Sequence, residues 1–119
     1  MSTDRGYAHP EPSRDEVDAL AGATVVEFGT PSCGYCRAAQ PLIAAAFAAR
    51  PGLRHLKVED GSGRPLGRSF GVKLWPTLVV LRDGREVARV VRPRSAAEVE
   101  QALAPNDGEA AESSSGPTP

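Results

Sequence analysis

Cys33 and Cys36 are the only cysteines of the 119-residue chain, and they stand three positions apart in the segment FGTPSCGYCRAAQPLI. The alanine-rich run after them predicts a helix that begins at the pair. Residues three apart at a helix start share one face, so the two sulfur atoms can approach to bonding distance. The spacing is compatible with half of a metal site, a structural disulfide or a redox centre.

The composition limits which partners and which cellular compartment we expect for this protein. The net charge is −1, so the chain offers no basic surface for nucleic acid or for anionic lipid. No apolar run is long enough for a signal peptide or for a membrane helix. If the chain begins at its native Met1, we therefore expect it in the cytoplasm as a monomer, with neither nucleic acid nor a membrane among its partners.

A metal site and a structural disulfide are both disfavoured. A closed zinc site needs about four protein ligands, and besides the cysteines the chain offers only His9 and His55, which lack the spacing of a zinc finger. We interpret His55 as an ordinary strand or surface residue and expect no metal. In a reducing compartment, a CxxC pair is more often catalytic or metal-binding than structural. A redox centre is the favoured interpretation.

The two cysteines should divide the work of a redox reaction. Cys33 would lie at the N-terminus of the helix, where free backbone N–H groups and the helix dipole stabilise an anion. A thiolate is favoured at such a place. We therefore predict that Cys33 attacks a disulfide and that Cys36 resolves the mixed disulfide.

Capping and turn signals predict eight elements around this pair. S-x-x-E capping boxes open the first and last helices, and Asp83-Gly84 is the signature of a type I′ hairpin. The expected elements are, in order, a helix over 14–21, a strand over 24–28, a helix over 34–50, a strand over 53–58, a short helix within 61–71, hairpin strands on either side of 83–84, and a helix from 96 that stops before Pro105. Strands joined through helices run parallel and the hairpin is antiparallel, so we predict an α/β fold with a mixed sheet and helices on both faces.

Three regions follow from this pattern. Residues 1–12 are polar, contain two prolines and show no periodicity, so we expect a flexible arm. Residues 13–104 form the folded domain, and 40% hydrophobic residues in the chain suffice for one modest core. Residues 105–119 have the composition of a disordered tail.

The chain resembles the thioredoxin family over about residues 14–103. The resemblance rests on the order of the elements and on two segments, VVEFGTPSCGYCRAAQPLI and SFGVKLWPTLVVLRDGREVARVV. The resemblance implies the thioredoxin fold and a protein-disulfide reductase that works by dithiol/disulfide exchange. Protein disulfides would be its substrates. It also implies no bound cofactor, because the redox-active disulfide would be reduced by an external enzyme similar to thioredoxin reductase.

Site residues outside the cysteine pair are implied by the same resemblance. Pro76 should follow a cis peptide bond and face the cysteines, so that the backbone of Trp75 can pair with an extended substrate. A trans proline at the start of a strand is the alternative. The Trp75 side chain could line the substrate groove or fill the core. Tyr35, exposed at the helix start, could contact substrate or belong to the ordinary surface.

Glu27 lies six residues before Cys33, where similar thioredoxins often carry a buried aspartate. A buried carboxylate should have a raised pKa and could relay the proton to or from Cys36. The alternative is a strand glutamate that pairs with Lys57 on the neighbouring strand.

Two departures from the usual thioredoxin pattern leave the direction of electron flow open. Ser32 stands where a tryptophan is typical, and Gly34-Tyr35 resembles the dipeptide of periplasmic disulfide isomerases. Because this dipeptide tunes the stability of the thiolate, a disulfide oxidase or isomerase is one alternative. A thioredoxin-like binding or chaperone module with incidental cysteines is another.

Overall fold

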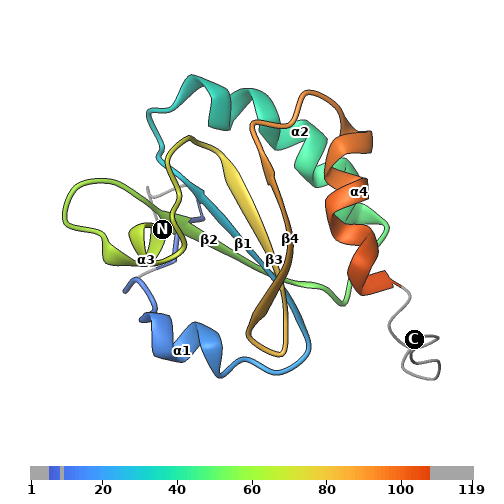
Figure 1. Ribbon diagram of the computed structural model, residues 1–119. Helices are drawn as coiled ribbons and strands as arrows, with labels where there is room; N and C mark the ends of the chain where they lie inside the picture. Colours follow the sequence, from blue (N-terminus) through green and yellow to red (C-terminus); the bar gives the residue numbers. More distant parts are fainter. Residues whose placement is uncertain (1–5, 9, 108–119) are drawn as a thin grey trace.

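The computed structural model describes residues 6–8 and 10–107 and contains the eight elements in the predicted order (Figure 1). The helices are α1 (Arg14–Asp18), α2 (Gly34–Ala48), α3 (Pro65–Ser69) and α4 (Ala96–Asp107). The strands are β1 (Ala23–Gly29), β2 (Arg54–Glu59), β3 (Thr77–Arg82) and β4 (Arg85–Val91). They form one sheet in the order β2-β1-β3-β4, in which the β1–β2 pair is parallel and the other two pairs are antiparallel. Within the described part of the chain, no helix is long and apolar enough to cross a membrane.

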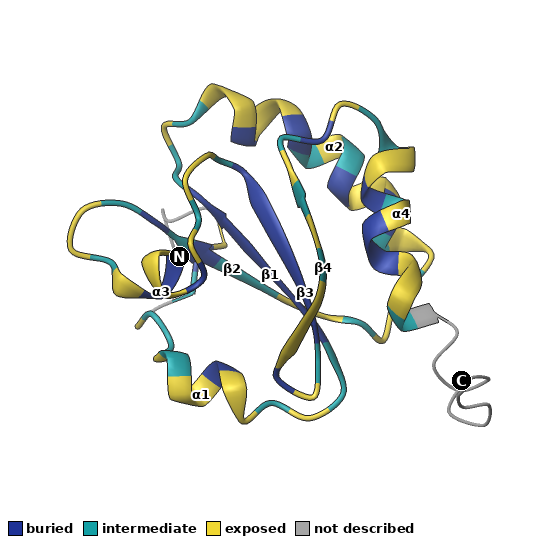
Figure 2. Ribbon diagram, viewed as in Figure 1, coloured by how far each residue is buried: buried dark blue, intermediate teal, exposed yellow. Residues whose placement is uncertain are grey.

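The sheet is covered on both faces because the side chains of its central strands alternate. Val25 on β1 packs with α2 and α4, whereas Val26 and Phe28 pack with α1 and α3. Figure 2 shows β1 and β3 buried between these two helical layers and β4 largely exposed at the edge. By the same alternation, Glu27 lies on the α2 side of the sheet.

The hairpin predicted around Asp83-Gly84 is confirmed. Asp83 has φ 52° and Gly84 has φ 80°, the left-handed conformations of a type I′ turn. A β-carbon on Gly84 would collide with the backbone of Asp18, so close packing also requires glycine here. The Asp83 carboxylate accepts a hydrogen bond of 2.7 Å from the N–H of Gly22. The hairpin is thus tied to the segment that joins α1 to β1.

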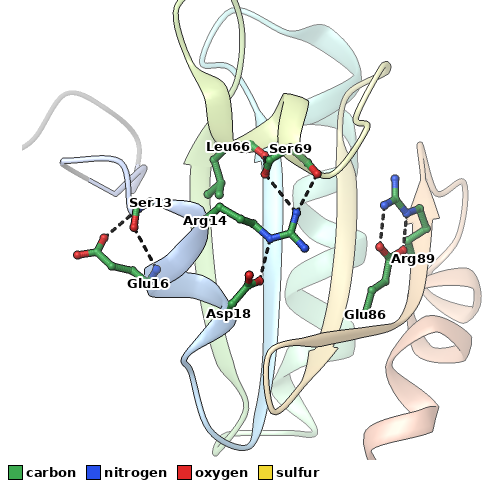
Figure 3. Close-up of polar contacts among 8 residues, drawn as sticks. All are labelled: Ser13, Arg14, Glu16, Asp18, Leu66, Ser69, Glu86 and Arg89. Atoms are coloured by element: carbon green, nitrogen blue, oxygen red, sulfur yellow. Dashed lines mark hydrogen bonds and ion pairs between the residues drawn. The ribbon is translucent and has the colours of Figure 1, made fainter.

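Helix α1 begins at its predicted capping box and ends at Asp18 rather than near residue 21. Figure 3 shows both bonds of the box: the Ser13 hydroxyl accepts from the Glu16 N–H at 3.0 Å, and the Glu16 carboxylate accepts from the Ser13 N–H at 2.9 Å. Arg14 binds Asp18 within the helix at 2.8 Å and the Ser69 carbonyl on α3 at 2.8 Å. The second bond joins the two short helices on this face of the sheet.

Helix α4 corrects one prediction, because it continues through Pro105 to Asp107. Proline removes one backbone donor and therefore usually ends a helix. Here the last turn is held from outside, since the Asn106 side-chain amide donates to the Leu81 carbonyl on β3 at 3.2 Å. The predicted tail thus begins within a helical turn, and residues 108–119 lie outside the described part of the chain.

The described residues of the arm before α1 contact the folded domain. Tyr7 is only 5% exposed, and the N–H of Ala8 donates to the Lys57 carbonyl on β2 at 2.7 Å. Glu11 accepts a 2.9 Å hydrogen bond from the N–H of Leu66 in α3. One aromatic ring and two polar contacts thus join this part of the arm to the folded domain, and its flexibility stays a prediction.

Candidate active site

Cys33 lies at the end of the β1–α2 loop, as the N-cap residue of α2. Its sulfur accepts a 3.1 Å hydrogen bond from the backbone N–H of Cys36, in the place where a serine or aspartate oxygen usually caps a helix. The sulfur thus lies beside a backbone donor at the positive end of the α2 dipole. Cys33 is partly exposed, Cys36 is 2% exposed, and both are free thiols. Of the two sulfur atoms, the one that can meet a substrate is therefore that of Cys33.

Burial distinguishes the Cys36 thiol from that of Cys33. It raises the pKa of Cys36 to about 12, and a hydrogen bond with the Cys33 side chain and the negative charge of Glu27 act in the same direction. Cys36 therefore stays protonated at neutral pH. It must lose this proton before it can attack a disulfide, because the thiolate is the nucleophile.

A small cavity lies beside the Cys36 sulfur, and Tyr7 closes one side of it. A β-carbon built on Gly29 would lie 2.6 Å from Cys36 Sγ and 3.3 Å from Tyr7 Oη, so these two atoms are no more than about 6 Å apart. The cavity has a volume of about 70 Å³, whereas a water molecule needs roughly 15 Å³. Its lining residues are Tyr7, Thr30, Pro31, Cys36, Arg37, Gln40 and Lys57. Burial is the largest cause of the raised pKa of Tyr7, and the negative charge of Glu27 acts in the same direction, so Tyr7 keeps its hydroxyl proton.

Glu27 is almost fully buried, with 1% of its surface exposed, yet both of its oxygens are hydrogen-bonded. His55 Nε2 lies 2.8 Å from one oxygen, and the Gln40 side-chain amide donates to the other at 2.8 Å. Burial raises the pKa of Glu27, but these two hydrogen bonds and the positive charges of His55 and Lys57 outweigh it, so that the pKa falls below its ordinary value. The prediction of a raised pKa is therefore wrong. The groups that keep the carboxylate ionised come from α2 and β2, and a strand pattern does not reveal them.

Gln40 connects Glu27 to the cysteine pair. It lies one turn after Cys36 on α2, and the amide that binds Glu27 also donates to the Cys36 carbonyl at 3.0 Å. The Lys57 ammonium donates to the Gln40 side-chain oxygen at 3.2 Å, so that Lys57 is linked to Glu27 through Gln40. Gln40 was not predicted as a site residue, although its i,i+4 spacing from Cys36 could have indicated it.

His55, interpreted from the sequence as an ordinary strand or surface residue, belongs to this site. Its ring stacks on Phe47 with the ring centroids 4.3 Å apart, and 30% of its side chain is exposed. The His55 ring therefore links the buried carboxylate of Glu27 to solvent. The pairing depends on strand register, because Glu27 stands opposite Lys57, two residues after His55, in the parallel β1–β2 pair.

The Trp75–Pro76 peptide bond is cis, as the resemblance implied. Because β1 and β3 are antiparallel, the loop before β3 leaves the sheet at the same end as the loop after β1, which carries Cys33. Trp75 is partly buried against the α1 and α3 side of the core, and its indole N–H donates to the Asp60 carboxylate at 2.8 Å. Its side chain thus contributes to the core, and its predicted contact with substrate stays a prediction.

Tyr35 projects from the first turn of α2 with 61% of its surface exposed. The guanidinium of Arg92, the residue after β4, lies 3.9 Å from the centroid of the Tyr35 ring. Arg92 Nε also donates to the Trp75 carbonyl at 2.8 Å. Arg92, which was not predicted as a site residue, therefore joins Tyr35 to the cis-proline loop. Contact between Tyr35 and substrate likewise stays a prediction.

No metal site is found around His55 in the described part of the chain. Among residues 6–8 and 10–107, no group of three or more His, Cys, Asp or Glu side chains is placed to hold a metal ion. His55 is bound to Glu27 instead. His9 lies outside the described residues.

A dithiol at the N-terminus of a helix, beside a cis-proline loop of a mixed four-stranded sheet, is the arrangement of a thiol-disulfide oxidoreductase. The family profile described as Thioredoxin matches residues 9–105. The chain belongs to the thioredoxin family and has the thioredoxin fold. Proteins of this family work through a redox-active disulfide and without a bound cofactor.

Relatives and solved structures agree with this assignment. The chain is 40% identical over 77 residues to a thioredoxin of Chlamydia muridarum, which covers 63% of this chain and 74% of that protein. It is 62% identical to thioredoxin 2 from Pseudomonas aeruginosa PAO1, whose structure in the reduced form superposes with a TM-score of 0.79 over 92% of this chain and 99% of that chain. It is also 42% identical over 66 residues to protein disulfide-isomerase A2 of Pongo abelii, but these residues are 52% of this chain and 13% of that protein.

Proposed function

We propose that this protein reduces disulfide bonds in other proteins, with Cys33 as the attacking and Cys36 as the resolving residue. The observation that carries the proposal is the contrast between the two sulfur atoms. The Cys33 sulfur is partly exposed and accepts a backbone N–H at the start of α2, whereas the Cys36 thiol is 2% exposed and has a raised pKa. The Cys33 sulfur is thus accessible to a large substrate, whereas the Cys36 thiol is buried and protonated until the second step.

The exchange has two steps. The Cys33 thiolate attacks one sulfur of the substrate disulfide, and the other substrate sulfur leaves as a thiolate that takes up a proton. Cys36 then loses its proton and attacks Cys33 Sγ, which releases the remaining substrate thiolate and forms the Cys33–Cys36 disulfide. The substrate gains two electrons and two protons, and the cysteine pair is oxidised.

Glu27 is the residue that we assign to the proton of Cys36. With its lowered pKa, the carboxylate is ionised at neutral pH and available as an acceptor, although it is a weaker base than the sequence predicts. The Cys36 cavity is large enough for a water molecule, and Gln40 binds both the Glu27 carboxylate and the Cys36 carbonyl. His55 then offers Glu27 an exit to solvent for the proton.

Turnover requires an external reductant for the Cys33–Cys36 disulfide. An enzyme of the thioredoxin reductase class, which draws electrons from NADPH through a flavin, would fit the family. The Gly34-Tyr35 dipeptide and the similarity to a disulfide isomerase favour an oxidase or isomerase as the second candidate. Location in the cytoplasm stays a prediction.

Turnover of insulin disulfides with dithiothreitol as the electron donor tests the catalytic assignment. Cys33→Ser should abolish turnover. Cys36→Ser, mixed with insulin in the absence of dithiothreitol, should react once and stop as a mixed disulfide that is visible by mass spectrometry. Ser32→Ala is the matched control, because it alters a neighbouring side chain without removing a sulfur. Equal rates for the wild type and Cys33→Ser would refute the assignment and leave the binding-module alternative.

The direction of electron flow is tested by the reduction potential of the cysteine pair. Equilibration with glutathione or dithiothreitol buffers, followed by Trp75 fluorescence, should give a potential below about −220 mV if the protein is a reductase in a glutathione-buffered compartment. A potential between about −120 and −180 mV would identify an oxidase or isomerase instead.

A further inference from the structure

Arg92 is held in an unusual backbone conformation beside the cis-proline loop. It follows the last residue of β4 and has φ 48°, in the left-handed region that residues other than glycine rarely adopt. Its backbone N–H donates to the Pro76 carbonyl at 2.9 Å. The surrounding structure therefore imposes the conformation, and such positions cluster at functional sites.

Two contacts fix the Arg92 side chain. Its Nε donates to the Trp75 carbonyl at 2.8 Å, and its guanidinium lies over the Tyr35 ring at 3.9 Å from the centroid. Its two terminal amino groups donate to no acceptor among the described residues. A guanidinium that is oriented in this way presents a planar set of unused donors, which suits a carboxylate.

A groove of about 740 Å³ lies next to this guanidinium. Its lining includes three exposed apolar side chains, Tyr35, Leu74 and Val91. Its charged side chains are Arg92, Arg94 and Glu98, so the groove carries a net positive charge. An apolar groove with a positive rim is complementary to an extended peptide that carries both apolar and acidic side chains.

We propose that Arg92 selects substrates by binding the carboxylate of an aspartate or glutamate next to the cysteine that Cys33 attacks. This inference rests on the proposed function, since it concerns the substrate of the same cysteine pair. The backbone of Trp75 was expected to pair with an extended substrate, and its carbonyl already accepts a hydrogen bond from Arg92 Nε.

Two synthetic peptides with an intramolecular disulfide, identical except for glutamate or glutamine beside one cysteine, provide the test. The wild type should reduce the glutamate peptide with a kcat/KM about fivefold higher at low ionic strength. In about 1 M salt, where the Debye length is roughly 3 Å, the preference should shrink. In Arg92→Gln the ratio of the two kcat/KM values should approach one. Arg85→Gln, which removes the same charge from the far end of β4, should keep the wild-type ratio.

Arg92→Gly is the second variant, because glycine accepts the left-handed backbone and removes only the side chain. Like Arg92→Gln, it should lose the preference for the glutamate peptide. The test then does not depend on the folding of one variant alone. Equal turnover of the two peptides by the wild type, or an unchanged ratio in both Arg92 variants, would overturn the inference alone. A wild type that reduces neither peptide nor insulin would overturn the proposed function itself. A dependence on Arg92 that appears with oxidised glutathione and not with the peptides would overturn the assignment to protein substrates.

Discussion

His55 Nε2 and Glu27 Oε1 lie 2.8 Å apart. The His55 side chain is partly exposed to solvent, whereas that of Glu27 is buried. Because the carboxylate is ionised, the His55 N–H is the donor in this bond. Together with the Gln40 amide on the other oxygen, it satisfies a charge that would otherwise be costly to bury. Glu27 is therefore part of a hydrogen-bonded network, and its chemistry depends on side chains from α2 and β2.

Replacement of His55 by alanine should destabilise the protein by about 1–3 kcal/mol at pH 7, because one buried carboxylate oxygen loses its donor. The pKa of Glu27 is lower in the folded protein than its ordinary value of 4.5, so the ionised carboxylate stabilises the fold above that pH. This stabilisation is lost as the pH falls through the folded-state pKa. Urea unfolding of the wild type and His55→Ala at pH 7 and at acidic pH should show the two free energies of unfolding converging on acidification. A constant difference would contradict the role of the pair.

Glu27→Gln separates two effects on Cys36 that have opposite signs. Removal of the negative charge of Glu27 lowers the pKa of Cys36, which by itself would speed its attack on the mixed disulfide. Removal of the proton acceptor would slow the same step. We expect the second effect to dominate, with about a tenfold slower resolution above neutral pH. Stopped-flow measurement of the resolution step against pH gives the answer, and a faster step would show that Glu27 acts through its charge alone.

Gly29→Ala should disturb the resolving cysteine directly. The added β-carbon would lie 2.6 Å from Cys36 Sγ, so the sulfur or the start of α2 must shift. We expect a loss of about 1–3 kcal/mol in the free energy of unfolding and reduced insulin turnover. Gly52→Ala is the matched control, because a β-carbon there meets nothing within 4 Å and should leave both measurements unchanged. Equal behaviour of the two variants would contradict the contact.

Tyr7 should protect Cys36 from reagents in solution. In the wild type, iodoacetamide at neutral pH should modify Cys33, the partly exposed thiol. Tyr7→Ala opens the cavity, and burial is the main cause of the raised pKa of Cys36, so Cys36 should become reactive. Tyr7→Phe keeps the ring and should keep the protection. Mass spectrometry of the modified peptides distinguishes the three proteins, and protection of Cys36 in Tyr7→Ala would exclude a shielding role.

The order of the elements and the cysteine pair could be predicted because their signals are local. A capping box opens α1, two left-handed residues form the Asp83-Gly84 turn, and the spacing of Cys33 and Cys36 places both at the start of α2. Each of these features involves residues that lie within a few positions of one another. Local propensity and geometry are sufficient for such features.

The chemistry around the pair was harder to predict, because it depends on contacts between distant segments. The hydrogen bonds that lower the pKa of Glu27 join it to His55, 28 residues away, and to Gln40, 13 residues away. Arg92 reaches the site only because β4 ends beside the loop before β3. Tyr7 lies in a segment whose polar composition hides the burial of one ring. A pattern reports which face a side chain is on, but not which partners it meets there.

The hydrogen bond between Ala8 and Lys57 has a consequence for behaviour at high concentration. β2 is an edge strand of the sheet, and its outward backbone groups could pair with a second molecule. The bond from the Ala8 N–H occupies one of these groups, the Lys57 carbonyl, with the protein's own chain. The segment that carries Tyr7 to the cavity therefore also covers part of an edge from which intermolecular strand pairing and aggregation would otherwise start.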